Sequence, residues 1–329
     1  MPRVVRFHEL GGPEVLRLET MDTPEPGAGE VRLRVHAIGL NRGEIMFRRG
    51  TYVKQPTFPT VLGVEAAGAI EAIGAGVTGF AIGDRVSTIP VFDMDAYSLY
   101  GEVSLAPARA LVRIPDNVSW ETAAASYGQF GTAWGALTRV AGLKRGQSIL
   151  IPAASSSVGL AAIQIANALG ARPIALTRRS NKKAALAAAG AAAVVATEEQ
   201  DLVAEVLKLT DGRGADIAFD PVGGPTFPKL VAATAPGGLI VLYGALSEEV
   251  TPLPMLGVVI RDVTIKGFGL PIATRDEVLF EDLKRFVNDG LQSGALKPVI
   301  ADRFPLTEIV EAHRRLEANQ HVGKFVVLT

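Results

Sequence analysis

Short, continuous apolar runs alternate with helical patterns from about residue 123 onward. These runs have the length of strands that are buried on both faces, and helices or crossovers separate them. The alternation is typical of a doubly wound parallel sheet, in which ligands bind beyond the carboxyl ends of the strands. The predicted strands are residues 148–151, 173–176, 193–195, 217–220, 239–243 and 263–268, and the predicted helices are 160–169, 201–209 and 226–234.

Residues 1 to about 120 follow a different pattern. Short runs such as 31–38 alternate between apolar and polar positions, and turns rich in Gly and Pro separate them, for example at 24–27 and 74–77. A period of two with frequent turns predicts a compact β-barrel-like domain with few helices.

The last part of the chain combines two helical stripes, within 279–287 and 309–316, with an apolar run at 325–328. Because a lone strand cannot bury itself, this tail is predicted to return to the N-terminal domain. The predicted domains are therefore 1–122 plus 269–329, and a cofactor domain at 123–268 that is inserted between them.

The turn at residues 153–159 follows the first predicted strand of the cofactor domain and precedes a helix. A strand, a tight turn and a helix are the first unit of a dinucleotide-binding domain, because a diphosphate can approach the N–H groups at the helix start. Aligned with the pattern GxGxxG, the glycine positions hold Ala154, Ser156 and Gly159, so only the last glycine is present. An ordinary strand-to-helix turn is the alternative.

The segment after the second strand favours NADP(H) over NAD(H). An NAD site places a carboxylate there for the ribose 2′-OH, whereas an NADP site places a cation near the 2′-phosphate. This chain has Thr177-Arg178-Arg179-Ser180, then Lys182 and Lys183, and no carboxylate. Cations are disfavoured at a helix N-terminus, so we expect an anion between them rather than only a solvated basic helix start.

Composition and charge narrow the class of protein. The 329 residues are 48% hydrophobic, and the formal net charge is −1. A near-neutral chain argues against nucleic acid or an anionic membrane as the main partner. With no cysteine, disulfides, thiolate catalysis and thiolate metal sites are excluded. No apolar stretch suits a signal peptide or a membrane span, so we expect a soluble, cytoplasmic protein.

An ordered set of short segments extends across the whole chain. The segments are 11–16, 41–52, 59–68, 83–86, 131–134, 153–159, 220–224 and 322–324. Together they resemble the zinc-free quinone oxidoreductases of the medium-chain dehydrogenase/reductase superfamily. The resemblance implies an α/β fold, with a Rossmann-type domain inserted into a GroES-like β-barrel catalytic domain.

The resemblance also implies the absence of a metal. Zinc-containing relatives have Cys where this chain has Asn41, and Gly-His-Glu where it has Gly63-Val64-Glu65. They also have a four-cysteine lobe near residues 90 to 110. Zinc prefers thiolate or imidazole ligands in a closed set, and the four histidines here are scattered. We interpret these histidines, His8, His36, His313 and His321, as surface residues or residues at the edge of a helical stripe.

Two residues match the catalytic pocket of the family. Asn41 matches an amide that contacts the nicotinamide ribose or the substrate oxygen, and Tyr52 matches a phenol at the pocket wall that could donate a proton. Glu44 matches a carboxylate that orients a backbone turn or a neighbour. Tyr97 and Tyr100 lie in a loop that corresponds to one near the cleft, but are as well explained as surface aromatics.

The cofactor residues that the resemblance implies fall at the ends of the predicted strands. The serine-rich turn would line the diphosphate, the basic segment would hold the 2′-phosphate, and the later positions would contact the nicotinamide. In full, they are Asn41, Thr132, Ser156, Ser157, Val158, Gly159, Thr177, Arg178, Ser180, Lys182, Gly244, Ala245, Phe268, Gly269, Leu270 and Lys324.

These features predict an NADPH-dependent reductase of small-molecule quinones or α,β-unsaturated carbonyls, in which no metal is needed because the acceptor is already electrophilic. An enoyl thioester reductase is an alternative, since Arg48, Arg49 and Lys54 offer charge for a coenzyme A phosphate. A non-catalytic NADPH-binding protein, crystallin-like or RNA-associated, is another. Members of the family often pair through the last strand of the cofactor domain, so residues 263–268 suggest a homodimer.

Overall fold

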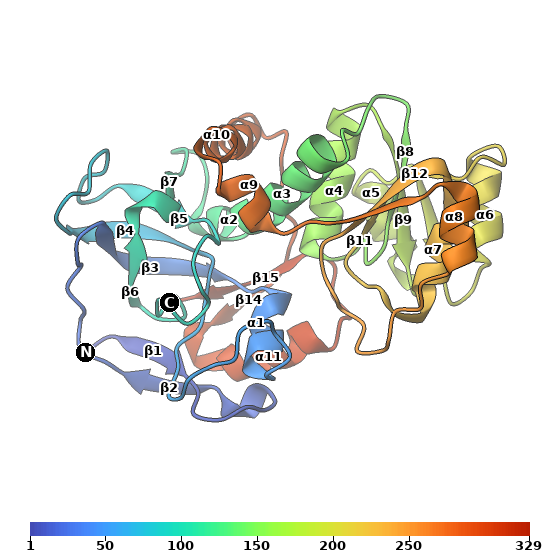
Figure 1. The fold of residues 1–329 in the computed structure, drawn as a ribbon. Helices are drawn as coiled ribbons and strands as arrows, with labels where there is room; N and C mark the ends of the chain where they lie inside the picture. The colour runs from blue at the N-terminus through green and yellow to red at the C-terminus, as the bar shows by residue number, and fades with distance from the viewer. The chain divides into compact units, whose positions relative to one another are not determined.

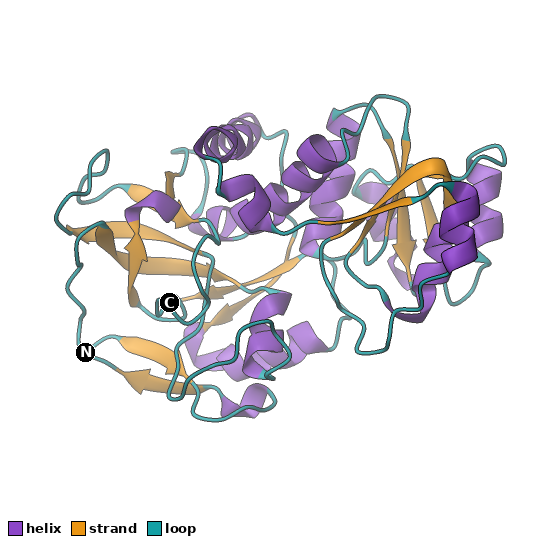
Figure 2. Cartoon of the chain, viewed as in Figure 1, coloured by secondary structure: helices purple, strands orange, loops and turns teal.

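The computed structural model describes residues 1–329, and contacts within the chain divide them into two compact units. Unit 1 comprises Met1–Gly128 and Lys284–Thr329, and unit 2 comprises Gln129–Leu283. Strands dominate unit 1, whereas helices cover a central sheet in unit 2 (Figure 2). The helices of the structure are all too short or too polar to cross a bilayer.

Unit 1 is built around a seven-stranded sheet. Its strand order is β14-β15-β3-β4-β5-β7, and β6 pairs with β3 beside this path; β1 and β2 form a separate hairpin. The strands and helices are β1 (Arg3–Arg6), β2 (Arg17–Thr20), β3 (Glu30–Gly39), α1 (Arg42–Arg48), β4 (Ala66–Ile73), β5 (Arg85–Thr88), β6 (Val103–Pro107), β7 (Leu111–Arg113), α2 (Trp120–Ala124), β14 (Ile300–Pro305), α11 (Ile309–Glu317) and β15 (Lys324–Leu328).

The C-terminal strand completes this sheet, as its short apolar sequence predicts. β15 pairs antiparallel with β3, placing Val326 opposite Gly39 and Val327 opposite Ile38. The alternating apolar positions of β3 point into a core that also includes the buried face of α11. Residues near the start of unit 1 are thereby brought next to residues near its end.

Unit 2 is a doubly wound parallel sheet, which confirms that prediction (Figure 1). The strand order is β10-β9-β8-β11-β12-β13, and every pair is parallel. Its elements are β8 (Ser148–Ile151), α4 (Ser157–Ala168), β9 (Arg172–Thr177), α5 (Lys183–Ala188), β10 (Ala193–Ala196), α6 (Leu202–Leu209), β11 (Ala215–Asp220), α7 (Phe227–Ala233), β12 (Thr234–Leu242), α8 (Met255–Arg261), β13 (Thr264–Gly267) and α9 (Leu270–Thr274).

Two helices cross the limits of the units, α3 (Tyr127–Trp134) and α10 (Glu277–Ser293). Contacts place the limits after Gly128 and Leu283, whereas the sequence pattern placed them after residues 122 and 268. Close packing keeps residues 269–283 with unit 2. A Cβ on Gly131 would lie 3.1 Å from Leu283, and one on Gly135 would lie 3.1 Å from Ala273 of α9.

Candidate active site

The turn between β8 and α4 can hold a phosphate with a single glycine. Ser156 precedes α4, and its hydroxyl accepts a hydrogen bond from the Gly159 N–H at 3.1 Å. A Cβ on Gly159 would lie 2.7 Å from the Cα and O atoms of Ala154, so this position requires glycine. Ala153 adopts φ 47°, a left-handed conformation that usually favours glycine. The first turn of α4, which includes the partly buried Ser157 and Val158, presents the N-terminal end of a helix, which suits a diphosphate.

A lysine from the next crossover lies against this turn. Lys182 Nζ donates to Ser155 Oγ at 3.1 Å. Burial, and then the charge of Arg178, lower the pKa of Lys182. A bound anion would relieve the repulsion between these two cations. Of the other predicted residues here, Thr177 is buried at the end of β9, and Ser180 is exposed.

Two carboxylates approach the same strand end from the loop after β10. Glu198 pairs with Arg179 at 2.9 Å, and Glu199 accepts a hydrogen bond from the Ser180 N–H at 3.1 Å. Glu198 and Glu199 are therefore engaged by Arg179 and by the Ser180 N–H at this strand end.

The remaining predicted cofactor residues of unit 2 lie mostly at the carboxyl ends of its later strands. The loops after β11 and β12 lie side by side, since the Leu246 N–H donates to the Pro221 carbonyl at 2.9 Å. The Phe268 N–H donates to the Leu242 carbonyl at 2.8 Å, which joins the ends of β12 and β13. These ends carry Gly244, Ala245, Phe268, Gly269 and Leu270, while Thr132 is half-buried in α3.

In unit 1, Asn41 stands immediately before α1, and its side chain has two partners. Its Oδ1 accepts a hydrogen bond from Lys324 Nζ at 2.8 Å, and its Nδ2 donates to the Gly39 carbonyl at 3.0 Å. The Asn41 residue is only partly buried. An amide carries two N–H bonds, so one Nδ2–H is left over from these contacts.

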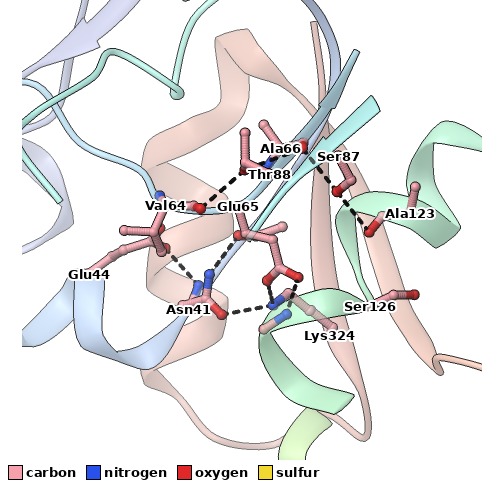
Figure 3. A network of polar contacts seen from close by, with 12 residues as sticks. Asn41, Glu44, Val64, Glu65, Ala66, Ser87, Thr88, Ala123, Ser126 and Lys324 are labelled. Carbon is pink, nitrogen blue, oxygen red and sulfur yellow. Dashed lines mark hydrogen bonds and ion pairs between the residues drawn. The ribbon is translucent and has the colours of Figure 1, made fainter. Parts of the chain in front are cut away.

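Lys324 and Glu65 form a buried ion pair beside Asn41 (Figure 3). Lys324 is 2% exposed and Glu65 is 0% exposed. The second carboxylate oxygen of Glu65 accepts from the Gly128 N–H at 2.8 Å. Lys324, predicted as a cofactor residue, thus has Asn41 and Glu65 as its partners in this structure.

Glu44 is buried on the other side of Asn41. Its carboxylate accepts hydrogen bonds from the Asn41 N–H at 2.7 Å, the Tyr100 hydroxyl at 2.6 Å and the Val64 N–H at 3.3 Å. Burial raises the pKa of Glu44 to about 7, although the hydrogen bonds from Tyr100 and Asn41 lower it. The hypothesis that Glu44 orients a backbone turn is confirmed by its contact with the Asn41 N–H, since Asn41 begins α1.

Tyr100 is fully buried, so its interpretation as a surface aromatic is wrong. Its hydroxyl also lies 3.3 Å from His313 Nε2. His313 is buried as well, within the helical stripe rather than at its edge, because α11 packs against the core of unit 1. Burial, and then the charge of Arg48, lower the pKa of His313 to about 3.

Tyr52 is half-buried at the edge of the core of unit 1. Burial, and then the charge of Asp93, raise the pKa of its phenol. Lys54 joins the Tyr52 segment to the loop at residues 93–95, since its Nζ lies 2.9 Å from Asp93 and 2.6 Å from Asp95. A neutral phenol can donate a hydrogen bond, but it is a weak acid at neutral pH.

The residues present do not fit a zinc ion. Nowhere in residues 1–329 do three or more His, Asp or Glu side chains gather as a possible metal site, and the chain has no cysteine. By the resemblance, Asn41 and Val64 stand where zinc-containing relatives have Cys and His, and Glu65, which those relatives share, pairs with Lys324.

Models of two domains match the chain. One, described as the alcohol dehydrogenase GroES-like domain, matches residues 27–116, and one described as zinc-binding dehydrogenase matches 157–283. A quinone oxidoreductase of Pseudomonas aeruginosa is 34% identical over 100% of both chains. The structure of Escherichia coli quinone oxidoreductase complexed with NADPH has a TM-score of 0.93 and 28% identity, and covers 99% of this chain and 100% of its own. A structure titled NAD-dependent alcohol dehydrogenase has a TM-score of 0.91 and 35% identity, covering 99% of both chains.

A doubly wound parallel sheet, inserted in sequence into a GroES-like unit, defines an oxidoreductase of the medium-chain dehydrogenase/reductase superfamily. The 34% identity with the Pseudomonas aeruginosa enzyme extends over the whole chain. The chain belongs to the quinone oxidoreductase family, which confirms the resemblance inferred from the sequence segments.

Proposed function

We propose that this protein is an NADPH-dependent reductase that acts on quinones or α,β-unsaturated carbonyl compounds. The observation that carries the choice of cofactor is the contact of Lys182 with Ser155 on the phosphate-binding turn. A cation at this place suits a 2′-phosphate, and the segment directly after β9, residues 178–180, contains no carboxylate of the kind that an NAD site places there. The Escherichia coli relative complexed with NADPH supports the same cofactor.

In this proposal the cofactor supplies a hydride, and the protein supplies binding and orientation. Ser156, Ser157, Val158 and Gly159 hold the diphosphate, while Lys182 and Arg178 hold the 2′-phosphate. Asn41 and Tyr52 offer N–H and O–H donors to the ligand oxygen, where negative charge develops as the acceptor is reduced. In a quinone or an enone that charge is delocalised, so hydrogen-bond donors suffice and no step requires a metal.

The alternative of an enoyl thioester reductase depended on Arg48, Arg49 and Lys54. In the structure both arginines pair with Glu317, and Lys54 pairs with the carboxylates at 93 and 95. Because these charges are already neutralised, they are poorly placed to attract a coenzyme A phosphate, and we favour the smaller acceptors.

An acceptor panel tests the proposal. The purified protein is incubated with NADPH or NADH and a para-quinone, an unsaturated ketone, an unsaturated aldehyde or an enoyl thioester, and loss of the reduced nucleotide is followed by absorbance. We expect quinone or enone to accelerate oxidation of NADPH far more than that of NADH. Binding without turnover of any acceptor supports the binding-protein alternative, and equal use of NADH contradicts the assigned phosphate site.

We also propose that the protein forms a homodimer through β13 and α8. β13 is the edge strand of the parallel sheet, with its outer backbone groups open to pairing. α8 exposes four apolar side chains, Met255, Leu256, Val259 and Ile260, each between 62% and 79% exposed. A second copy that adds its own β13 would continue the sheet and cover these side chains.

A further inference from the structure

We infer that Lys324 and Glu65 are positioning residues that hold the Asn41 amide in one orientation and make the N–H it presents a stronger hydrogen-bond donor. This inference rests on the proposed function, in which Asn41 donates to a ligand oxygen. Figure 3 shows the three side chains converging from three segments: the start of α1, the residue before β4, and the first residue of β15.

The partners of Asn41 fix which way its amide faces. Lys324 Nζ, a donor only, lies 2.8 Å from Oδ1, and the Gly39 carbonyl, an acceptor only, lies 3.0 Å from Nδ2. A flipped amide would place N–H bonds against the ammonium and its oxygen against a carbonyl. Both contacts would be repulsive, so the remaining Nδ2–H is held in a single direction.

The support behind the amide is rigid. Lys324 and Glu65 are almost fully buried, and Glu65 is anchored a second time by the Gly128 N–H. There is also no spare volume, since a Cβ on Gly39 would lie 2.8 Å from Lys324 Cε and 2.0 Å from the Ala124 carbonyl. The lysine therefore has little freedom to leave Asn41.

A buried ion pair needs an explanation other than stability. The cost of removing two charges from water often cancels their attraction, and an apolar pair of similar size serves the fold equally well. The Lys324 ammonium, in contrast, draws electrons from the amide through Oδ1 and makes the remaining N–H of Asn41 a stronger hydrogen-bond donor. This effect would be greatest when the ligand oxygen gains negative charge.

A double-mutant cycle tests the inference. Lys324→Met with Glu65→Gln removes both charges together, so that no lone carboxylate is buried. We expect kcat with a quinone to fall by about 10- to 100-fold, as for a misplaced catalytic group, with little change in the KM for NADPH. In the Asn41→Ala background the same two substitutions should cause almost no further loss of kcat, because the amide that Lys324 and Glu65 position is gone.

Arg48→Met with Glu317→Gln is the matched control, because it removes another ion pair of unit 1, between buried Arg48 and partly buried Glu317, that does not touch Asn41. Its loss of kcat, if any, should multiply with that of Asn41→Ala. Equal losses from Lys324→Met with Glu65→Gln in the presence and absence of the Asn41 amide would overturn the inference.

A second measurement does not depend on turnover. Selective ¹⁵N labelling of asparagine side chains reports the two Nδ2–H protons of Asn41, assigned by their loss in Asn41→Ala. We expect distinct, slowly exchanging signals in the wild type and rapid averaging in Lys324→Met with Glu65→Gln. Unchanged signals would refute the positioning role. If the wild type reduces no acceptor, the proposed function fails, while these signals still decide whether Lys324 orients the amide.

Discussion

Replacing Glu44 with glutamine is expected to change how the free energy of unfolding depends on pH. Burial raises the pKa of Glu44 from an ordinary value of 4.5 to about 7. Between these pH values the folded protein holds a proton that the unfolded chain has lost. The stability linked to this proton is fully present below pH 4.5, and is lost as the pH rises through about 7.

Its magnitude follows from the size of that interval. Each pH unit between the two pKa values corresponds to about 1.4 kcal/mol. As the pH rises from 4.5 to about 7, the free energy of unfolding of the wild type should therefore fall by about 3 kcal/mol relative to that of Glu44→Gln. Glutamine keeps the size of the side chain and retains one oxygen for the Asn41 N–H and the Tyr100 hydroxyl, but it does not titrate.

Urea unfolding followed by tryptophan fluorescence, at several pH values from below 5 to about 8, measures this difference. His313, with its pKa lowered to about 3, loses folded-state stability as the pH falls below its ordinary value of 6.5. That contribution is shared by wild type and variant and cancels in the comparison. A difference between the two proteins that stays constant with pH would refute the assignment of a protonated, buried Glu44.

Three further predictions concern the cofactor site, the packing beside Asn41 and the assembly. Lys182→Ala should raise the KM for NADPH by about 10- to 100-fold, which corresponds to the loss of one hydrogen bond to a charged group, and should leave the KM for NADH nearly unchanged. Lys183→Ala, at an exposed position, is the control, and equal effects on the two KM values would contradict the proposed 2′-phosphate site. Gly39→Ala should lower the free energy of unfolding, measured by urea unfolding, by about 1–3 kcal/mol through overpacking. Gly267→Ala, whose added Cβ would meet nothing within 4 Å, should change the free energy of unfolding little. Val259→Glu should convert the proposed dimer into a monomer in sedimentation velocity, and a wild type that sediments as a monomer would disprove the proposed interface.

Regular patterns in the sequence were enough to predict the sheet of unit 2. Its buried strands are continuous apolar runs, and the structure reproduces residues 148–151 without change. α8 was missed because Met255–Arg261 is almost uniformly apolar and has no polar face to reveal a helical period. The apolar side chains of α8 are exposed in the single chain, so α8 has no buried face from which a helical period could be recognised.

The candidate site was predicted in part. Ser155 occupies a variable position of the glycine pattern, and only the approach of Lys182 from the following crossover shows its significance. Likewise, no local pattern links Asn41 to Lys324, because 283 residues separate them and the sheet pairing of β15 with β3 brings them together. Local periodicity predicts elements, whereas contacts of this kind depend on the completed fold.

The position of β15 in the sequence has a consequence for folding in the cell. Translation delivers every strand of the inserted unit before it delivers β14 and β15, so unit 2 has its full set of partners while unit 1 still lacks the neighbour of β3. Until β15 emerges, residues 37–39 of β3 keep an open edge that is prone to pairing with other chains. A chain truncated after α10 would therefore contain every strand of the parallel sheet but leave the sheet of unit 1 incomplete and prone to aggregation.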